Sequence, residues 1–255
     1  MVDRERPEAV TPEPAATVCL VRESQSGLEV YLTRRHADLV FLGGFHVFPG
    51  GKVDREDGSP AMLGRCRLQG PLAAAAPGVA DPEQGMGFRV AAIREVFEET
   101  GVLLAEGASA VPAERLAAFR RELHAEQRSF LSLLETEDLY LPVDRLLWFA
   151  HWVTPATSPR RFDTHFFAAP MPAGQEVSPF PDEVSASGWE QPKAAIERWK
   201  QGQIKIIPPT LASLDFLSRF ADWTSLSREL EPGTLRRVGN AALGVETAAL
   251  PKRKG

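Results

Sequence analysis

The sequence has few cysteines and lacks long hydrophobic runs. Its 255 residues include two cysteines, Cys19 and Cys66, too few for a disulfide framework or a four-cysteine zinc site. We expect both to be small apolar side chains in a reducing compartment. The longest apolar runs, such as residues 146–150, fall far short of the ~20 residues that a membrane-spanning helix requires. The sequence therefore argues against a disulfide-stabilised scaffold and against a helical membrane protein.

An excess of basic residues is also missing. The chain has 29 Lys and Arg against 34 Asp and Glu, a formal net charge of −5, which argues against a nucleic-acid polymer as partner. Residues 1–14 are charged and rich in proline, without the basic-then-apolar pattern of a signal segment. Hydrophobic residues make up 44% of the chain and charged residues 25%, as in soluble globular proteins. We therefore expect a cytoplasmic protein with no membrane partner.

Short hydrophobic patterns divide the chain into strands and helices. Two β-prone runs at 16–20 and 28–33 flank a polar turn, which predicts a hairpin. Glycine and proline then punctuate a short apolar strand between Gly43 and Gly51. We expect further strands at 146–153, 162–168 and 184–189, and helices at 89–100, 112–135, 192–200 and 209–220.

These patterns predict one domain between two tails. The tails are expected at 1–14 and 239–255, and the domain over 15–238. Residues 58–88 are rich in glycine, proline and alanine, and we interpret them as an insertion with room for one short helix.

The helix expected at 89–100 carries the clearest chemical signal. Its apolar residues share one face, and Gly101 follows as a helix stop. On the other face, spacings of three and four residues bring Glu95, Glu98 and Glu99 side by side. Like charges at this spacing, in the last turn of a helix, are unfavourable unless a cation binds. Mg²⁺ prefers such oxygen ligands, so the three glutamates are candidate metal ligands; a solvated acidic face is the alternative.

The sequence around this helix resembles the Nudix box. Residues 94–102, Arg-Glu-Val-Phe-Glu-Glu-Thr-Gly-Val, match its second half, R-E-U-x-E-E-x-G-U with U aliphatic, at every specified position. The first half, G-x5-E, is similar to the segment from Gly51 to Asp57, with aspartate in place of glutamate. The family separates this acid from Arg94 by eight positions. Here the separation is 94 − 57 = 37, so 29 extra residues interrupt the box and leave the role of Asp57 open.

The resemblance implies a fold and a mechanism. The fold is an α/β/α Nudix sandwich with a mixed sheet, to which helices within 112–136 and 192–238 would be additions. The reaction is attack of a metal-activated water on a pyrophosphate, with Mg²⁺ or Mn²⁺ held by the three glutamates and with Arg94 orienting one of them. The general base is one of the helix glutamates or a later acid. The later acid we propose as a candidate general base is Glu183. The alternative is that Glu183 simply lies in a solvated turn.

Other segments resemble the coenzyme A diphosphatase branch of the family, whose box carries a long insertion. Leu32 to Gly51 fits most of the pattern L-L-T-x-R-S-x3-R-x3-G-x3-F-P-G-G, but Tyr31, His36 and Val40 depart from it, and Val40 replaces an expected arginine. Residues 160–167 are also similar to that branch. The implied substrate is coenzyme A or acyl-coenzyme A. The candidate residues for binding its phosphates are Gly50, Gly51, Arg35 and Arg161. The alternative for the two arginines is that they are ordinary surface cations.

Several alternatives stay open. Within the enzyme class they are ADP-ribose, NADH and dinucleoside polyphosphates as substrates. Outside it they are a non-catalytic Nudix-fold nucleotide-binding module and an acidic-helix interaction domain. The intact acidic face favours an enzyme. The oligomeric state, a homodimer among the options, also stays open.

Overall fold

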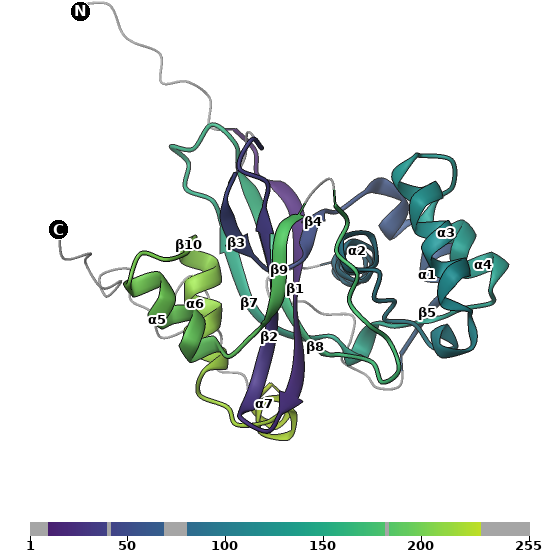
Figure 1. Ribbon diagram of the computed structural model, residues 1–255. Coiled ribbons are helices and arrows are strands. Elements are labelled where there is room, and N and C mark those ends of the chain that lie inside the picture. The colour runs from purple at the N-terminus through teal and green to yellow at the C-terminus, as the bar shows by residue number, and fades with distance from the viewer. Residues whose placement is uncertain (1–9, 40–41, 69–80, 182–183, 231–255) are drawn as a thin grey trace, which may run out of the picture.

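A mixed sheet forms the centre of the molecule (Figure 1). The computed structural model describes residues 10–39, 42–68, 81–181 and 184–230. Eight strands build the sheet: β1 (Glu13–Ser24), β2 (Gly27–Arg35), β3 (Phe45–Val47), β4 (Gly50–Lys52), β7 (Leu147–Val153), β8 (Phe162–Pro170), β9 (Val184–Glu190) and β10 (Lys205–Ile206). Their order is β10-β3-β2-β1-β8-β7, with β4 also paired to β1 and β9 to β2. The pairs β1–β8 and β10–β3 are parallel and the others antiparallel.

Helices cover both faces of this sheet (Figure 1). On one face lie α2 (Pro82–Thr100), α3 (Ala113–His124) and α4 (Phe130–Thr136); on the other lie α5 (Pro192–Lys200), α6 (Pro208–Leu217) and α7 (Trp223–Glu229). Because side chains alternate along a strand, β1 contributes to both cores. Val18 and Leu20 pack in the α2 core, and Cys19 and Val21 in the α5–α6 core. The expected α/β/α sandwich is therefore present, and the helices after residue 192 are its second helical layer.

The helix α2 begins earlier than expected, at Pro82 instead of residue 89. Proline at the first helical position and the Asp81 side chain, which accepts from the Glu83 amide, define its start. Gly85 and Gly87 interrupt the hydrophobic pattern there. A Cβ added at Gly87 would lie 3.7 Å from Gly58, so this part of the helix packs on that segment at ordinary van der Waals distance.

The interval 58–88, interpreted as an insertion, contributes to the fold at both of its ends. Its first part forms a short helix, α1 (Pro60–Leu63), whose Met62 is fully buried in the α2 core. A short strand, β5 (Cys66–Arg67), then pairs with β6 (Leu141–Pro142) in a second, parallel sheet. Its last residues form the first turns of α2. Residues 69–80 lie outside the described part of the chain.

The other expected elements occur close to their expected bounds. One or two helices were expected within 112–135, and two are present, α3 and α4; α5 matches its expected range. The first tail is shorter than expected, since β1 starts at Glu13. The second tail, at 239–255, and Val40 lie outside the described residues. Among the described helices, none combines the length and the hydrophobicity needed to cross a bilayer.

Candidate active site

The three glutamates lie in the last turns of α2, where the helix stops as the sequence indicates. Gly101 adopts a left-handed conformation (φ 74°), and its amide closes the helix on the Phe97 carbonyl at 2.9 Å. Glu95 and Glu98 are half-buried and Glu99 is buried. The acidic face is therefore largely shielded from solvent rather than fully solvated.

Arg94 binds the acidic residues around it. Its Nε and Nη2 donate to the two carboxylate oxygens of Asp57, each at 3.0 Å. Its Nη1 donates to Glu95 at 2.9 Å and to Glu98 at 3.1 Å, and Nη2 also donates to the Lys52 carbonyl at 2.8 Å. A planar guanidinium can make such forked contacts with fixed geometry. Arg94 therefore sets the positions of two candidate metal ligands.

Asp57 joins this network although 37 positions separate it from Arg94. It is 1% exposed and lies in the 3-10 turn η1 (Arg55–Gly58), where it also accepts from the Asp54 amide at 2.7 Å. Burial raises the pKa of Asp57, and the bonds to Arg94 oppose that shift. The sequence left the role of Asp57 open; the structure gives it a contact that holds Arg94 in place.

Burial and mutual repulsion make the glutamates costly to ionise. Burial, together with the nearby charge of Glu98, raises the pKa of Glu95 to about 7, although Arg94 opposes the shift. Burial also raises the pKa of Glu98. A divalent cation would offset this repulsion, and clustered carboxylate oxygens are the ligands that Mg²⁺ prefers. The donor set therefore fits the metal that the sequence implies.

The glycines of β4 let the strand approach both β1 and the acidic helix. A Cβ added at Gly51 would lie 2.5 Å from the Glu95 carboxylate, and one at Gly50 would lie 2.3 Å from the Ala16 carbonyl oxygen. A side chain at Gly50 would collide with the main chain of β1, and one at Gly51 would have to displace the Glu95 carboxylate. Gly51 therefore lies against the acidic face, whereas Gly50 lies against β1.

The other candidate residues are not gathered around the glutamates in the same way. Arg35 ends β2 opposite Val184 of β9. Arg161 precedes β8, and its guanidinium donates to the Thr154 carbonyl at 3.0 Å and to the Val10 carbonyl at 2.6 Å, so it ties the start of the described chain to the β7–β8 hairpin. Glu183 lies outside the described residues.

A second ionisable cluster on β7 and β8 was not anticipated from the sequence. His151, Asp163 and His165 place donor atoms within 4.8 Å of one another, a spacing that could hold a metal ion. However, the Trp148 indole donates to Nδ1 of His165 at 3.0 Å. Neutral His165 therefore carries its proton on Nε2 and has no free lone pair for a cation, and burial lowers its pKa to about 4. This bonding favours a structural hydrogen-bonded cluster.

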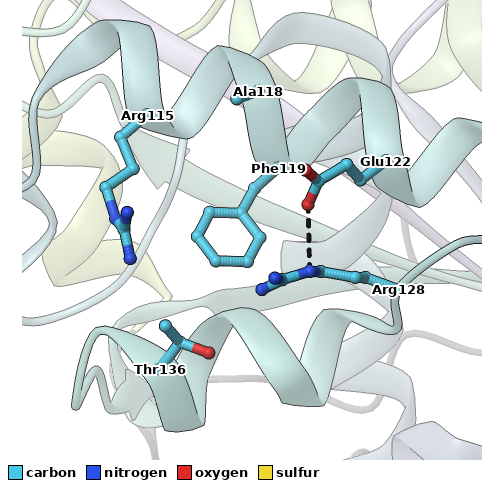
Figure 2. Close-up of a pocket in the computed structure, with 6 residues that line it drawn as sticks. All are labelled: Arg115, Ala118, Phe119, Glu122, Arg128 and Thr136. Atoms are coloured by element: carbon cyan, nitrogen blue, oxygen red, sulfur yellow. Dashed lines mark ion pairs between the residues drawn. The ribbon is translucent and has the colours of Figure 1, made fainter.

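A small hollow of about 130 Å³ between α3 and α4 also lies apart from the glutamates (Figure 2). Arg115 and Arg128 flank the ring of Phe119 there, and both form ion pairs, with Glu137 and Glu122 respectively. Its cations are thus engaged within the protein, and the hollow shows no convergent set of groups for chemistry.

Comparisons with known proteins identify the family of the chain. A family model described as the NUDT19 Nudix domain matches residues 8–217. The chain belongs to the Nudix family. A solved structure, the NUDIX hydrolase from Alicyclobacillus acidocaldarius, is similar with a TM-score of 0.71 at 25% sequence identity, over 88% of this chain and 99% of that one. The Nudix sandwich expected from the resemblance is thereby confirmed.

Two curated relatives of this Nudix protein carry the name acyl-coenzyme A diphosphatase NUDT19. The chicken protein (Gallus gallus) is 30% identical over 240 residues, covering 78% of this chain and 64% of the relative. The human protein (Homo sapiens) is 29% identical over 260 residues, covering 88% and 68%. The chain spans about two thirds of the length of these relatives. The resemblance to the coenzyme A diphosphatase branch is confirmed.

Proposed function

We propose that this protein is a Nudix hydrolase that cleaves the pyrophosphate linkage of a nucleoside diphosphate derivative. The observation that carries the proposal is the Arg94 network, in which one buried guanidinium binds Asp57, Glu95 and Glu98. A non-catalytic nucleotide-binding module or an acidic interaction domain has no need to hold buried carboxylates together against their repulsion.

The residues of the chain have distinct roles in this proposal. Glu95, Glu98 and Glu99 would hold Mg²⁺ or Mn²⁺, and Arg94 orients two of them. A bound divalent cation supplies Lewis acidity, which activates water and offsets charge on phosphate oxygens. Gly51 brings the main chain of β4 against the Glu95 carboxylate, so the main chain at Gly50 and Gly51 could approach a diphosphate bound at the metal. A glutamate of the cluster or Glu183 would accept the proton of the attacking water.

The substrate we propose is coenzyme A or an acyl-coenzyme A. Two observations support it: the Leu32–Gly51 pattern and the name of the chicken and human relatives, acyl-coenzyme A diphosphatase. Cleavage would give 3′,5′-ADP and a phosphopantetheine fragment. Arg35 and Arg161 remain our candidates for phosphate contacts, and Arg161 already donates to two main-chain carbonyls.

A substrate panel with product chromatography tests this proposal. Coenzyme A, acetyl-coenzyme A, dephospho-coenzyme A, ADP-ribose, NADH and a dinucleoside polyphosphate are compared with Mg²⁺, with Mn²⁺ and with a chelator. We expect metal-dependent cleavage, with the highest kcat/KM for a coenzyme A species. A contact to the 3′-phosphate should favour coenzyme A over its dephospho form by roughly ten- to a hundredfold. A higher kcat/KM for ADP-ribose or NADH would refute the substrate and keep the Nudix reaction.

We also propose a cytoplasmic location, in line with the composition, and a free nucleotide rather than a nucleic-acid polymer as the partner. A homodimer stays a prediction that sedimentation can test.

A further inference from the structure

The last turn of α2 contains carbonyl groups that have no hydrogen-bond donor within the same helix. The last four carbonyls of an α-helix lack an intrahelical partner, and a buried carbonyl without a partner is costly. In α2 the first of the four, on Phe97, accepts from the Gly101 amide. The remaining three belong to Glu98, Glu99 and Thr100. Two of these residues carry candidate metal-binding carboxylates, so their main-chain position matters for the site.

The helix α3 binds the carbonyl of Glu98. Arg120 Nε donates to it at 2.7 Å, and His124 Nε2 lies 2.9 Å away. Because a carbonyl oxygen can only accept, His124 must donate through Nε2. Arg120 is 7% exposed, and its positive charge also offsets the partial negative charge at the end of the helix.

Residues 178–180 bind the other two carbonyls. The Phe180 amide donates to Glu99 at 3.0 Å, and the Ser178 amide donates to Thr100 at 2.7 Å. All three carbonyls are therefore bound by segments outside the Nudix box.

The same two side chains of α3 also contact this second segment. Arg120 Nη1 donates to the Ser178 carbonyl at 2.5 Å. The His124 ring stacks on the Phe180 ring with centroids 3.6 Å apart and planes 10° from parallel. Arg120 and His124 thus join α2, α3 and residues 178–180 at one point.

We propose that Arg120 and His124 are positioning residues for the metal-binding glutamates. Arg94 binds the side chain of Glu98, whereas Arg120 and His124 bind its main chain, so both parts of the residue are fixed. The inference rests on the proposed function, because it assigns these contacts to the geometry of the metal site. A displacement of about 1 Å in a catalytic group can cost on the order of a hundredfold in rate.

Arg115 provides a matched control for Arg120. It lies on the same helix, but its guanidinium binds Glu137 and lies 5.5 Å from the Phe119 ring centroid, on the side of α3 that faces α4 (Figure 2). Arg115→Ala therefore removes the same kind of side chain without removing a bond to α2.

The experiment measures Mn²⁺ affinity by electron paramagnetic resonance, together with kcat, KM and Tm, on the full chain. In Arg120→Ala we expect Mn²⁺ affinity to fall by roughly ten- to a hundredfold, as is usual when an outer partner of a metal ligand is lost. We expect kcat to fall by about tenfold or more with KM changed little. Arg115→Ala should stay close to the wild type in both, and Arg120→Lys should recover part of the loss through one remaining donor.

The outcomes separate the two proposals. Mn²⁺ affinity and kcat in Arg120→Ala equal to those of Arg115→Ala would overturn the positioning role and leave the hydrolase intact. A wild-type protein without Mn²⁺ binding or metal-dependent hydrolysis would overturn the proposed function and this inference together. Should Arg120→Ala fail to fold, His124→Ala decides by the same criteria, since it removes one donor and the ring stack from a half-buried position.

Discussion

Two buried arginines lie five residues apart on α2, and their contacts differ in kind. Arg89 is 4% exposed and donates to the carbonyls of Val143 at 3.0 Å and Leu146 at 2.5 Å. Arg94 is 7% exposed and donates to three carboxylates. Both side chains are buried. Arg89 donates to main-chain carbonyls, whereas Arg94 donates mainly to side-chain carboxylates and to one main-chain carbonyl, that of Lys52.

The charges of the two side chains respond accordingly. Burial lowers the pKa of Arg89 to about 10, with a smaller opposing effect from Asp144. Burial acts on Arg94 in the same direction, but Asp57, Glu95 and Glu98 together raise its pKa above the usual value. Burial of an arginine alone therefore does not identify a functional site; the chemistry of its acceptors does.

The largest effect should come from removing a carboxylate that Arg94 orients. Glu98→Gln keeps size and hydrogen bonding but loses the charge that a divalent cation requires. We expect kcat to fall by about a hundredfold or more, equivalent to about 3 kcal/mol of transition-state stabilisation, with little change in Tm. Glu83→Gln, in the exposed first turn of the same helix, is the control. Wild-type turnover in both Glu98→Gln and Glu99→Gln would refute the proposed metal site.

Arg94→Lys should have the next largest effect, on both activity and stability. Lysine keeps one positive charge but lacks the planar fork that binds Asp57 through two oxygens. We expect kcat to fall by roughly tenfold to a hundredfold, because Glu95 and Glu98 are no longer oriented. Stability should fall by about 1–3 kcal/mol as buried hydrogen bonds are lost. Steady-state kinetics and urea unfolding measure the two effects; a change in stability alone would make Arg94 equivalent to Arg89.

Arg89→Met should affect stability alone. The substitution leaves the carbonyls of Val143 and Leu146 buried without this donor, at a cost of about 1–3 kcal/mol. The kcat of the folded fraction should stay near the wild-type value. As control, Arg145→Met removes an exposed ion pair with Glu106 and should cost less than about 1 kcal/mol. Urea unfolding with active-site titration makes the comparison, and a large fall in kcat for Arg89→Met would contradict the distinction between the two arginines.

The same contrast explains how far the sequence could predict this protein. The glutamates, Arg94 and Gly101 are contiguous, and helical periodicity alone brings them together. The bond between Asp57 and Arg94 joins residues 37 positions apart, so helical periodicity could not predict it. Gly85 and Gly87 likewise interrupt the hydrophobic pattern of the first turns of α2, which the sequence did not predict.

Hydrogen bonds to main-chain groups are even harder to predict from a sequence. Arg120 and His124 are four residues apart on an expected helix, so their shared face was predictable. Their acceptor, the Glu98 carbonyl, could not be predicted, because every residue has a carbonyl and the sequence does not single one out. The face of β8 that carries Asp163 and His165 follows from strand alternation, but the bond from Trp148 that decides its chemistry depends on the register of β7 with β8.

The smallest effect we predict is a pH dependence in how metal stabilises the protein. The folded pKa of Glu95, about 7, lies above its ordinary value of 4.5. Without metal, the resulting stabilisation is fully present below the ordinary value and is lost as the pH rises through about 7.

A divalent cation needs the deprotonated carboxylate and so competes with the proton. The increase in Tm on adding Mg²⁺ should therefore be larger at about pH 8 than at about pH 6. In Glu95→Gln the increase should be smaller and should depend less on pH, because one of the titrating ligands is gone. Scanning calorimetry with Mg²⁺ and with a chelator measures both; an equal increase at the two pH values in the wild type would show that Glu95 is not the group that titrates at the metal site.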